Sequence, residues 1–202
     1  MTNSIGEIPG TDAFFIIGSN TTETHPVIGS KIRKAVRENG AKLIVADPRE
    51  IDIAKDADVY LQLKPGTNVA LINGMMHIIL EEGLQDGEFI NERTEGYEDL
   101  VEILKPYTPE VVAEICNLDK DDIIKAARIY GSAGVAAIYY AMGITQHTTG
   151  TNGVMSLSNL GLLTGNIGKE SGGINPLRGQ NNVQGACDMG GLPGDYPGYQ
   201  KV

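Results

Sequence analysis

The sequence contains no tryptophan and few aromatic residues of any kind, with three phenylalanines and eight tyrosines among 202 residues. A hydrophobic core must therefore be built mainly from Ile, Leu, Val, Ala and Met. Apolar residues make up 41% of the chain, which argues against a largely disordered protein. The length suffices for one domain with a sizeable core.

Basic residues are also scarce, because 16 Lys and Arg face 26 Asp and Glu and leave a net charge of −10. Apart from a short cluster in SKIRKAVREN they are scattered, so we expect no binding to nucleic acid. The two cysteines, Cys116 and Cys187, form no CxxC pair, which favours neither a disulfide scaffold nor a zinc site. No signal peptide opens the chain and no apolar run approaches the length of a membrane span, so we expect a cytoplasmic protein.

Short apolar runs that end in turn residues are present at four places, and each predicts a buried strand: 13–18, 41–48, 59–67 and 135–143. Apolar residues at helical spacing predict helices between and after them, over 25–40, 68–83 and 150–166, and 84–133 is expected to be helical throughout. Residues 1–12 are expected to be an irregular lead-in. This alternation predicts an α/β fold: a doubly wound, mostly parallel sheet with helices on both faces.

Small or hydrogen-bonding residues follow every predicted strand. In open α/β sheets, ligands bind beyond the carboxyl ends of the strands, and these ends share one edge. We therefore expect a polar site made of Gly18, Ser19 and Asn20 after the first strand, Asp47, Pro48 and Arg49 after the second, Pro65, Gly66, Thr67 and Asn68 after the third, and Met142, Gly143 and Gln146 after the fourth.

Each of these segments taken alone has a plainer interpretation. Gly18-Ser19-Asn20 suits a phosphate near a helix start, or it is a simple strand-to-helix turn, and it lacks the GxGxxG pattern of nicotinamide-binding folds. Asp47 stands where dinucleotide folds place a ribose-binding carboxylate, or it forms an Asx turn before Pro48. Arg49 either meets a phosphate or base, or is an ordinary solvated arginine.

The histidines and the closing stretch also allow two interpretations. His25 precedes a proline at a helix start, where capping or packing is favoured over catalysis, and three scattered histidines do not make a metal site. The stretch 174–200 is rich in Gly, Asn and Gln and carries Arg178. It suits either a polar or anionic ligand, or an ordered surface loop.

These residues resemble a known family. The run NPLRGQNNVQGACDMGGLPGDYPGY, together with FFIIGSNTTETHPV, KLIVADPRE, LKPGTNVALINGM, AMGITQHTTG and LTGNIGKESGGINPLRGQ, closely resembles the formate dehydrogenase large subunit of the molybdopterin (bis-guanine-dinucleotide) oxidoreductase superfamily. The motifs GSN, DPR and LTGNIG recur across that superfamily, whereas the run around RGQNNVQGACDMG points to formate dehydrogenase. The resemblance covers essentially the whole chain.

The resemblance implies molybdenum or tungsten held by two molybdopterin guanine dinucleotides, and formate and carbon dioxide as substrates. Gly18, Ser19, Asn20 and Glu23 would approach the pyrophosphate and pterin arm, and Asp47 would bind the guanosine ribose beside Pro48 and Arg49. Gly66, Thr67 and Asn68 would line the guanine end, and Met142, Gly143 and Gln146 would face the pterin. Arg178 would orient formate through its carboxylate, with Gly179 and Gln180 next to the pterin.

Parts of the family pattern are missing. No cysteine or selenocysteine followed by histidine is present to bind the metal, and no iron–sulfur segment for a 4Fe-4S cluster. We therefore expect an internal fragment that is inactive alone: a dinucleotide-binding domain over residues 1–180, and 181–202 entering a neighbouring domain. The remaining domains and an electron-transfer subunit would be partners. A non-catalytic nucleotide-binding module and another molybdopterin oxidoreductase are the alternatives.

Overall fold

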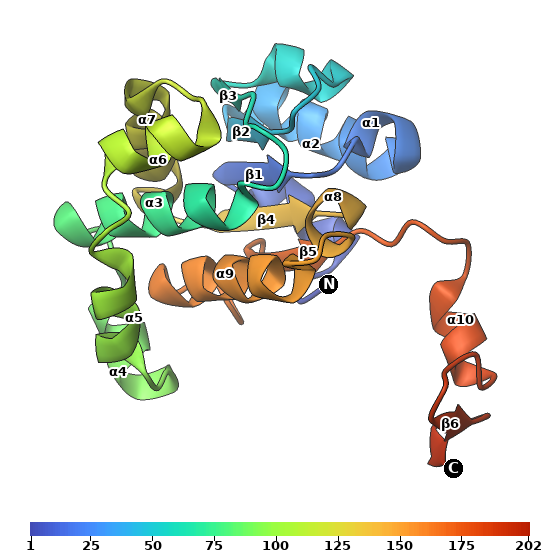
Figure 1. The fold of residues 1–202 in the computed structure, drawn as a ribbon. Coiled ribbons are helices and arrows are strands. Elements are labelled where there is room, and N and C mark those ends of the chain that lie inside the picture. Colours follow the sequence, from blue (N-terminus) through green and yellow to red (C-terminus); the bar gives the residue numbers. More distant parts are fainter.

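The computed structural model describes all 202 residues and has a five-stranded sheet at its centre (Figure 1). The strand order is β3-β2-β1-β4-β5, and every neighbouring pair is parallel. The strands are β1 (Ala13–Ile17), β2 (Lys42–Ala46), β3 (Val59–Leu61), β4 (Ala136–Tyr140) and β5 (Gly173–Pro176). The predicted doubly wound α/β class is confirmed.

Helices cover both faces of the sheet. One face packs on α2 (Pro26–Asn39) and the 3-10 helices η1 (Ile5–Gly10) and η2 (Asp52–Asp56); the other packs on α3 (Asn68–Glu81), α7 (Lys120–Gly131) and α9 (Gly150–Leu163). Successive side chains of β1 alternate between the two cores, with Phe14 facing α2 and Phe15 facing α3 and α7. Since both faces are buried, β1 is a continuous apolar run rather than an alternating one.

Local sequence signals explain where α2 begins and ends. Pro26 occupies its first position, where the missing N–H costs no helical hydrogen bond. Gly40 ends the helix in the left-handed conformation at φ 75°. Ile28 and Ile32 lie on the buried face, as the predicted four-residue spacing requires.

The stretch 84–133 is not helical throughout, so that prediction is wrong in detail. It forms four helices: α4 (Gly87–Arg93), α5 (Tyr97–Leu104), α6 (Pro109–Cys116) and α7. Asp86, Thr108 and Asp119 each accept a hydrogen bond from a backbone N–H in the first turn of the helix that follows, and Gly96 adopts φ 74° before α5. These caps stop one helix and start the next.

Other details also differ from the sequence prediction. β3 ends at Leu61 and is followed by a loop, and β4 ends at Tyr140 before one helical turn, α8 (Met142–Thr145). The predicted irregular lead-in contains η1, and another short helix, α1 (Thr21–Thr24), precedes α2. The edge strand β5 was not predicted, because four residues that include Gly and Pro carry no local strand signal.

Glu7 ties the N-terminal helix to the turn before β5. Its carboxylate accepts hydrogen bonds from the Ser171 N–H at 2.9 Å, the Asn3 amide at 2.8 Å and the Ser4 N–H at 2.9 Å. These donors, that of Ser171 foremost, lower the pKa of Glu7 below its ordinary value. The start of the chain is thereby held next to the edge strand.

Residues after Asn181 form an arm that leaves the body of the molecule (Figure 1). The arm contains α10 (Val183–Asp188), which has no buried residue, and the short antiparallel pair β6 (Asp195–Tyr196) and β7 (Gln200–Lys201). Its hydrogen bonds are internal: the Asp188 carboxylate accepts from the Tyr199 hydroxyl at 2.6 Å and from the Gln184 amide at 3.2 Å. The arm therefore has local structure but no packed core.

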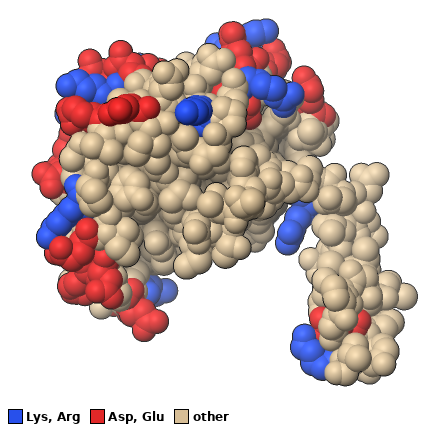
Figure 2. Space-filling view, viewed as in Figure 1, with Lys and Arg blue, Asp and Glu red and all other residues tan.

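Charged side chains gather away from the face over α8 and α9, as Figure 2 shows. The sequence of α9, GTNGVMSLSNLGLL, contains no charged residue. No helix of the structure is both long enough and apolar enough to cross a membrane.

Candidate functional site

The carboxyl ends of the strands meet at a topological switch point. From β1 the chain passes to β2 on one side, while β4 lies on the other side of β1. Ligands in open α/β sheets bind at such a point, because the loops after the two central strands diverge there and leave a crevice. The loops after β1, β2 and β4 all contribute to this edge.

Gly18 and Gly143 bring the ends of β1 and β4 into direct backbone contact. The Gly143 N–H donates to the Gly18 carbonyl at 3.0 Å. A Cβ added to Gly18 would lie 2.6 Å from the carbonyl carbon of Gly143, and Gly18 adopts φ +58°. Only glycine allows both this approach and this conformation without strain. The Asn68 amide donates to the Gly143 carbonyl at 3.3 Å, which draws the start of α3 to the same point.

An open cleft of about 310 Å³ lies at this junction. Its lining contains no large hydrophobic side chain and consists of Gly18, Asn20, Asp47, Pro48, Arg49, Pro65, Gly66, Asn68, Gly143 and His147. Sequence reasoning singled out all of these for the site except His147. The predicted gathering of strand-end residues is thus observed for loops from three strands and for the start of α3.

Asp47 is nearly buried, with 7% of its surface exposed. Its Oδ1 accepts a hydrogen bond from the Arg49 N–H at 2.9 Å, so the Asx turn allowed by the sequence is present. Its Oδ2 makes no hydrogen bond within the chain. The Tyr60 hydroxyl donates to the Asp47 carbonyl at 3.0 Å, and the Gln62 amide donates to the Pro48 carbonyl at 3.1 Å. The loop after β2 is therefore held on the segment that begins with β3.

Tyr60 is a donor at neutral pH, as any phenol is, and its raised pKa extends that state to higher pH. Burial is the main cause, and the negative charges of Asp47 and Glu50 add to it. A phenol with a raised pKa stays protonated at neutral pH, so its hydroxyl continues to support the backbone of Asp47.

The start of α3 presents free backbone donors to the cleft. Thr67, at the cap position, makes no side-chain hydrogen bond to the helix, because its hydroxyl donates to the Lys64 carbonyl at 2.6 Å instead. Gly66 adopts φ +88°, and nothing lies within 4 Å of where its Cβ would be. The unpaired N–H groups of a first helical turn suit acceptor atoms or a negative charge.

A second, smaller cleft of about 120 Å³ lies beside the first, between the ends of β4 and β5. It is lined by Tyr140, Ala141, Met142, Thr145, Gln146, Pro176, Leu177, Arg178, Gly179 and Gln180. Burial raises the pKa of Tyr140, and the positive charge of Arg178 partly opposes this effect. The structure thus groups Met142 and Gln146 with the predicted substrate residue.

Three predicted residues lie outside these two clefts. Ser19 is buried and its hydroxyl lies 3.0 Å from that of Thr21, which supports the turn. Thr67 is half-buried beside the larger cleft. Glu23 lines a separate hollow along α2, with Arg33 and Arg37.

Sequence reasoning missed the roles of two histidines. His147 lines the larger cleft, and its Nε2 lies 2.9 Å from the Gly143 carbonyl oxygen. His25 makes no side-chain cap on α2, so the capping interpretation is wrong, and its Nε2 lies 2.7 Å from the Arg178 carbonyl oxygen. No local sequence pattern predicts either of these two hydrogen-bond contacts.

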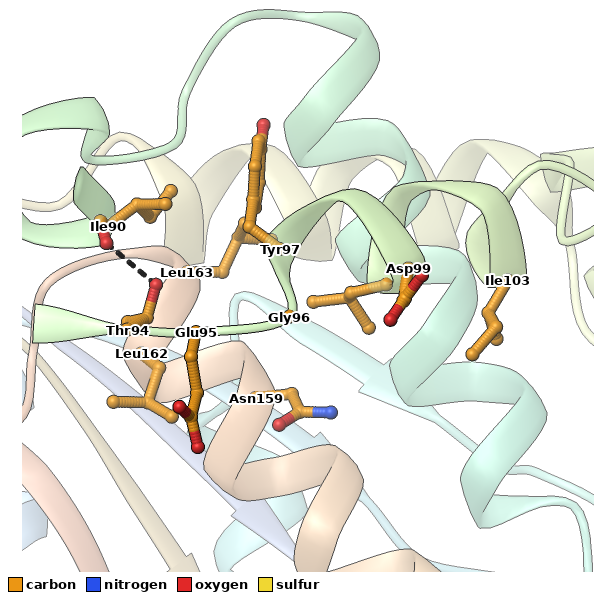
Figure 3. Close-up of a pocket in the computed structure, with 11 residues that line it drawn as sticks. Ile90, Thr94, Glu95, Gly96, Tyr97, Asp99, Ile103, Asn159, Leu162 and Leu163 are labelled. Atoms are coloured by element: carbon orange, nitrogen blue, oxygen red, sulfur yellow. Dashed lines mark hydrogen bonds between the residues drawn. The ribbon is translucent and has the colours of Figure 1, made fainter.

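An apolar hollow of about 250 Å³ lies elsewhere, between α4, α5 and α9 (Figure 3). Ile90, Ile103, Leu162 and Leu163 line it, and Glu95 is also in its lining. Figure 1 shows α4 and α5 at the far end of the molecule from α1 and α8. This hollow contains no residue predicted for the site.

No cluster of three or more His, Cys, Asp or Glu side chains is placed to hold a metal ion. Both cysteines are free thiols. Cys116 is buried at the end of α6, and burial raises its pKa, partly opposed by its hydrogen bond to the Thr67 carbonyl. Cys187 is half-buried in the arm.

Comparison with known proteins identifies the family of the chain. The family model described as molybdopterin oxidoreductase matches residues 1–202. The F420-dependent formate dehydrogenase subunit alpha of Methanocaldococcus jannaschii is 59% identical over all 202 residues, which span 30% of that protein. Formate dehydrogenase H of Escherichia coli is 50% identical over the same residues, which span 28% of it.

Among solved structures, acetylene hydratase from Pelobacter acetylenicus superposes with a TM-score of 0.77 and 29% identity. The match covers 84% of this chain and 23% of the hydratase. The chain therefore spans less than a third of the length of the relatives that it matches. The strand-end clefts, the doubly wound sheet and the full-length match together lead to one conclusion: the chain belongs to the molybdopterin oxidoreductase family.

Proposed function

We propose that this chain is a domain of a formate dehydrogenase catalytic subunit, and that it binds one molybdopterin guanine dinucleotide along the edge formed by β1, β2 and β4. The observation that carries the proposal is the cleft at the switch point, whose lining consists largely of residues that the family resemblance assigns to the dinucleotide. The identities of 50% and 59% to formate dehydrogenases favour formate as the substrate of the whole protein.

The residues present fit such a group. A dinucleotide needs donors for its phosphates, acceptors for its ribose hydroxyls and space for its base. The guanidinium of Arg49 supplies a donor for phosphate, and Oδ2 of Asp47 supplies an acceptor for the ribose. The free N–H groups at the start of α3 supply donors for acceptor atoms of the guanine. Gly66 leaves open space where a side chain would otherwise stand.

In this proposal the dinucleotide runs across the edge of the sheet. The guanine lies near Gly66, Thr67 and Asn68, and the ribose lies near Asp47. Gly18, Ser19 and Asn20 face the pyrophosphate. The pterin lies toward Met142, Gly143, Gln146, Gly179 and Gln180. Glu23 stands apart from both clefts, and its contact with the pyrophosphate arm requires a side-chain rearrangement.

Arg178 is the proposed substrate residue. A planar guanidinium pairs with a carboxylate through two parallel hydrogen bonds, which fixes both the position and the orientation of formate. Arg178 is exposed at the rim of the smaller cleft, beside Met142 and Gln146. When bound, the metal–pterin group supplies the electron acceptor for formate oxidation, and this chain contributes the positive charge that holds the substrate.

The proposal extends to the remaining protein, since the chain spans about 30% of its relatives. It includes a second molybdopterin guanine dinucleotide, molybdenum or tungsten, and a 4Fe-4S cluster in other parts of the subunit, with a partner subunit for electron transfer in the cytoplasm. Residues 181–202 would enter a neighbouring domain. The exposed side chains of Met189 and Tyr196 on the arm, and the charge-poor face over α9, support such a contact.

The experiment that tests the proposal uses the complete subunit that contains this chain. Arg178→Lys keeps the charge but loses the planar fork, so kcat/KM for formate should fall about ten- to a hundredfold, as expected for a charged hydrogen-bonded pair. Arg93→Lys is the matched control, because Arg93 is exposed on α4, far from the site. Equal activity of the two variants would refute the role of Arg178.

The alternative of a non-catalytic nucleotide-binding module predicts binding of guanine nucleotides without formate turnover by the complete subunit. The hydratase among the relatives shows that one fold of this kind can serve different reactions. Assays of the complete subunit with formate therefore decide between these alternatives. The 202-residue chain alone should show no turnover.

A further inference from the structure

A histidine connects the two sides of the proposed site. His25 stands between β1 and α2, and Arg178 follows β5, 153 residues later in the chain. The imidazole Nε2 lies 2.7 Å from the backbone carbonyl oxygen of Arg178. A carbonyl oxygen can only accept, so Nε2 carries the hydrogen and donates it.

The other ring nitrogen faces the turn after β1. Nδ1 of His25 lies 2.9 Å from the Thr24 hydroxyl oxygen, which is itself 2.9 Å from the Asn20 carbonyl oxygen. The hydroxyl has one hydrogen, which it gives to Nδ1 or to that carbonyl. A continuous row of polar groups thus runs from Asn20, in the cofactor-binding turn of the proposed function, to the backbone of Arg178.

Beyond Leu177, the backbone around Arg178 has one hydrogen bond and one side-chain contact, that of Met142, which lies where a Cβ of Gly179 would be. Leu177 is buried, and its N–H donates to the Tyr140 carbonyl at 2.7 Å. Residues 178–181 are exposed, and the contact with His25 is their only hydrogen bond. Beyond them the chain turns into the arm and away from the body (Figure 1). The direction in which Arg178 leaves the sheet therefore depends on this contact.

We infer that His25 is a positioning residue that fixes the backbone of Arg178 relative to the turn Gly18-Ser19-Asn20. This inference rests on the proposed role of Arg178 in holding formate. When His25 holds this carbonyl, the side chain of Arg178 extends from a fixed backbone position at the rim of the smaller cleft. Without it, the substrate-binding group is free to move with the arm, and formate binding weakens while the cofactor-binding loops stay in place.

Replacement of His25 by Gln or by Asn distinguishes the hydrogen bond at Nε2 from the contact at Nδ1. The Gln amide nitrogen reaches where Nε2 stands and the Asn amide nitrogen reaches only as far as Nδ1, so His25→Gln keeps the donor to Arg178 and His25→Asn loses it. In the complete subunit, His25→Asn should raise the KM for formate about three- to tenfold, the worth of one hydrogen bond, with kcat changed less. His25→Gln should restore most of the binding. Pterin and metal content should equal that of the unmodified protein in both variants.

His77→Asn provides a matched control. His77 lies on α3, away from the clefts, and its Nδ1 is 3.2 Å from the Leu104 carbonyl oxygen. Its substitution should leave the KM for formate unchanged. Thermal unfolding of every variant shows whether a kinetic change reflects loss of fold, and the comparison of Asn with Gln at position 25 keeps the test valid if one variant is less stable.

A second measurement on the 202-residue chain does not depend on the role of Arg178 in formate binding. Trypsin cleaves after arginine, so the bond that it would cut here contains the very carbonyl that His25 holds. The rate at which the fragment that begins at Gly179 is released, followed by mass spectrometry, should rise about three- to tenfold in His25→Asn and much less in His25→Gln.

The outcomes separate the two ideas. If His25→Asn changes neither the release of this fragment nor the KM for formate, while Arg178→Lys impairs formate oxidation, the positioning role is wrong and the proposed function stands. If Arg178→Lys has no effect but His25→Asn accelerates cleavage, His25 does hold the Arg178 backbone and the proposed role of Arg178 fails. A similar effect of Asn and Gln at position 25 on both measurements would overturn the positioning role.

Discussion

Gly18→Ala is expected to destabilise the protein strongly, because the substitution has both a conformational and a steric free-energy cost. The first is conformational: Gly18 adopts φ +58°, and an L-residue with a Cβ costs about 1–2 kcal/mol in that region. The second is steric, because the added Cβ would lie 2.6 Å from the carbonyl carbon of Gly143 and 2.9 Å from its Cα. Both are backbone atoms that no rotamer change can move.

Relief of that overlap requires β1 and β4 to separate at their ends, against the Gly143 N–H hydrogen bond of 3.0 Å to the Gly18 carbonyl. Overpacking of this kind costs about 1–3 kcal/mol. Together the two costs predict a loss of about 2–5 kcal/mol in the free energy of unfolding. For a domain of this size, such a loss lowers the melting temperature by about 10 °C.

Gly40→Ala is the matched control, because Gly40 adopts φ +75° with nothing within 4 Å of an added Cβ. It should lose only the conformational cost, about 1–2 kcal/mol. Urea denaturation followed by circular dichroism gives both free energies of unfolding, and guanine nucleotide titration reports on the cleft. Equal losses in the two variants would refute the argument that the strand ends touch, and with it the geometry of the larger cleft.

Three further predictions concern stability and reactivity. A thiol reagent at neutral pH should modify Cys187 rapidly and Cys116 only on unfolding, because Cys116 is fully buried and burial raises its pKa; equal rates would contradict this. The carboxyl of Asp58 is partly buried, which alone would raise its pKa, but hydrogen bonds and cationic neighbours outweigh burial and lower it. Its stabilising contribution is therefore present above the ordinary pKa of 3.8 and lost as the pH falls below it, so Asp58→Asn should flatten the acid limb of a stability–pH curve. Asn166→Ala should cost about 1–3 kcal/mol in urea denaturation, because it leaves the buried Ala136 N–H without the acceptor now 2.8 Å away; a neutral result would show that another acceptor replaces it.

Much of the sheet is predictable because its strongest signals are local. β1 and β4 are short, uninterrupted apolar runs that end in turn residues, which is the pattern of a strand buried on both faces. The prediction that strand ends gather at one edge follows from parallel strands alone. On this basis the sequence predicts that Asp47 and Asn68 lie at the same edge of the sheet, and both line the larger cleft.

β5 and the breaks in 84–133 were not predictable from local pattern. β5 is a strand only because β4 offers it a hydrogen-bonding edge. The breaks depend on single caps such as Asp86 and on the left-handed Gly96, which compete with a strong helical periodicity. In both cases the local preference of the sequence is weak, and contacts with the surrounding structure determine which conformation forms.

By itself the sequence determined the α/β class, the order of the main elements and the residues that follow each central strand, because hydrophobic periodicity and turn residues act over short distances. Its resemblance to formate dehydrogenases rests on the same contiguous motifs. Only the tertiary structure decided that Gly18 touches Gly143 and that His25 holds the carbonyl of Arg178. Those contacts join residues more than a hundred positions apart, and such contacts exist only once the sheet has brought the strand ends together.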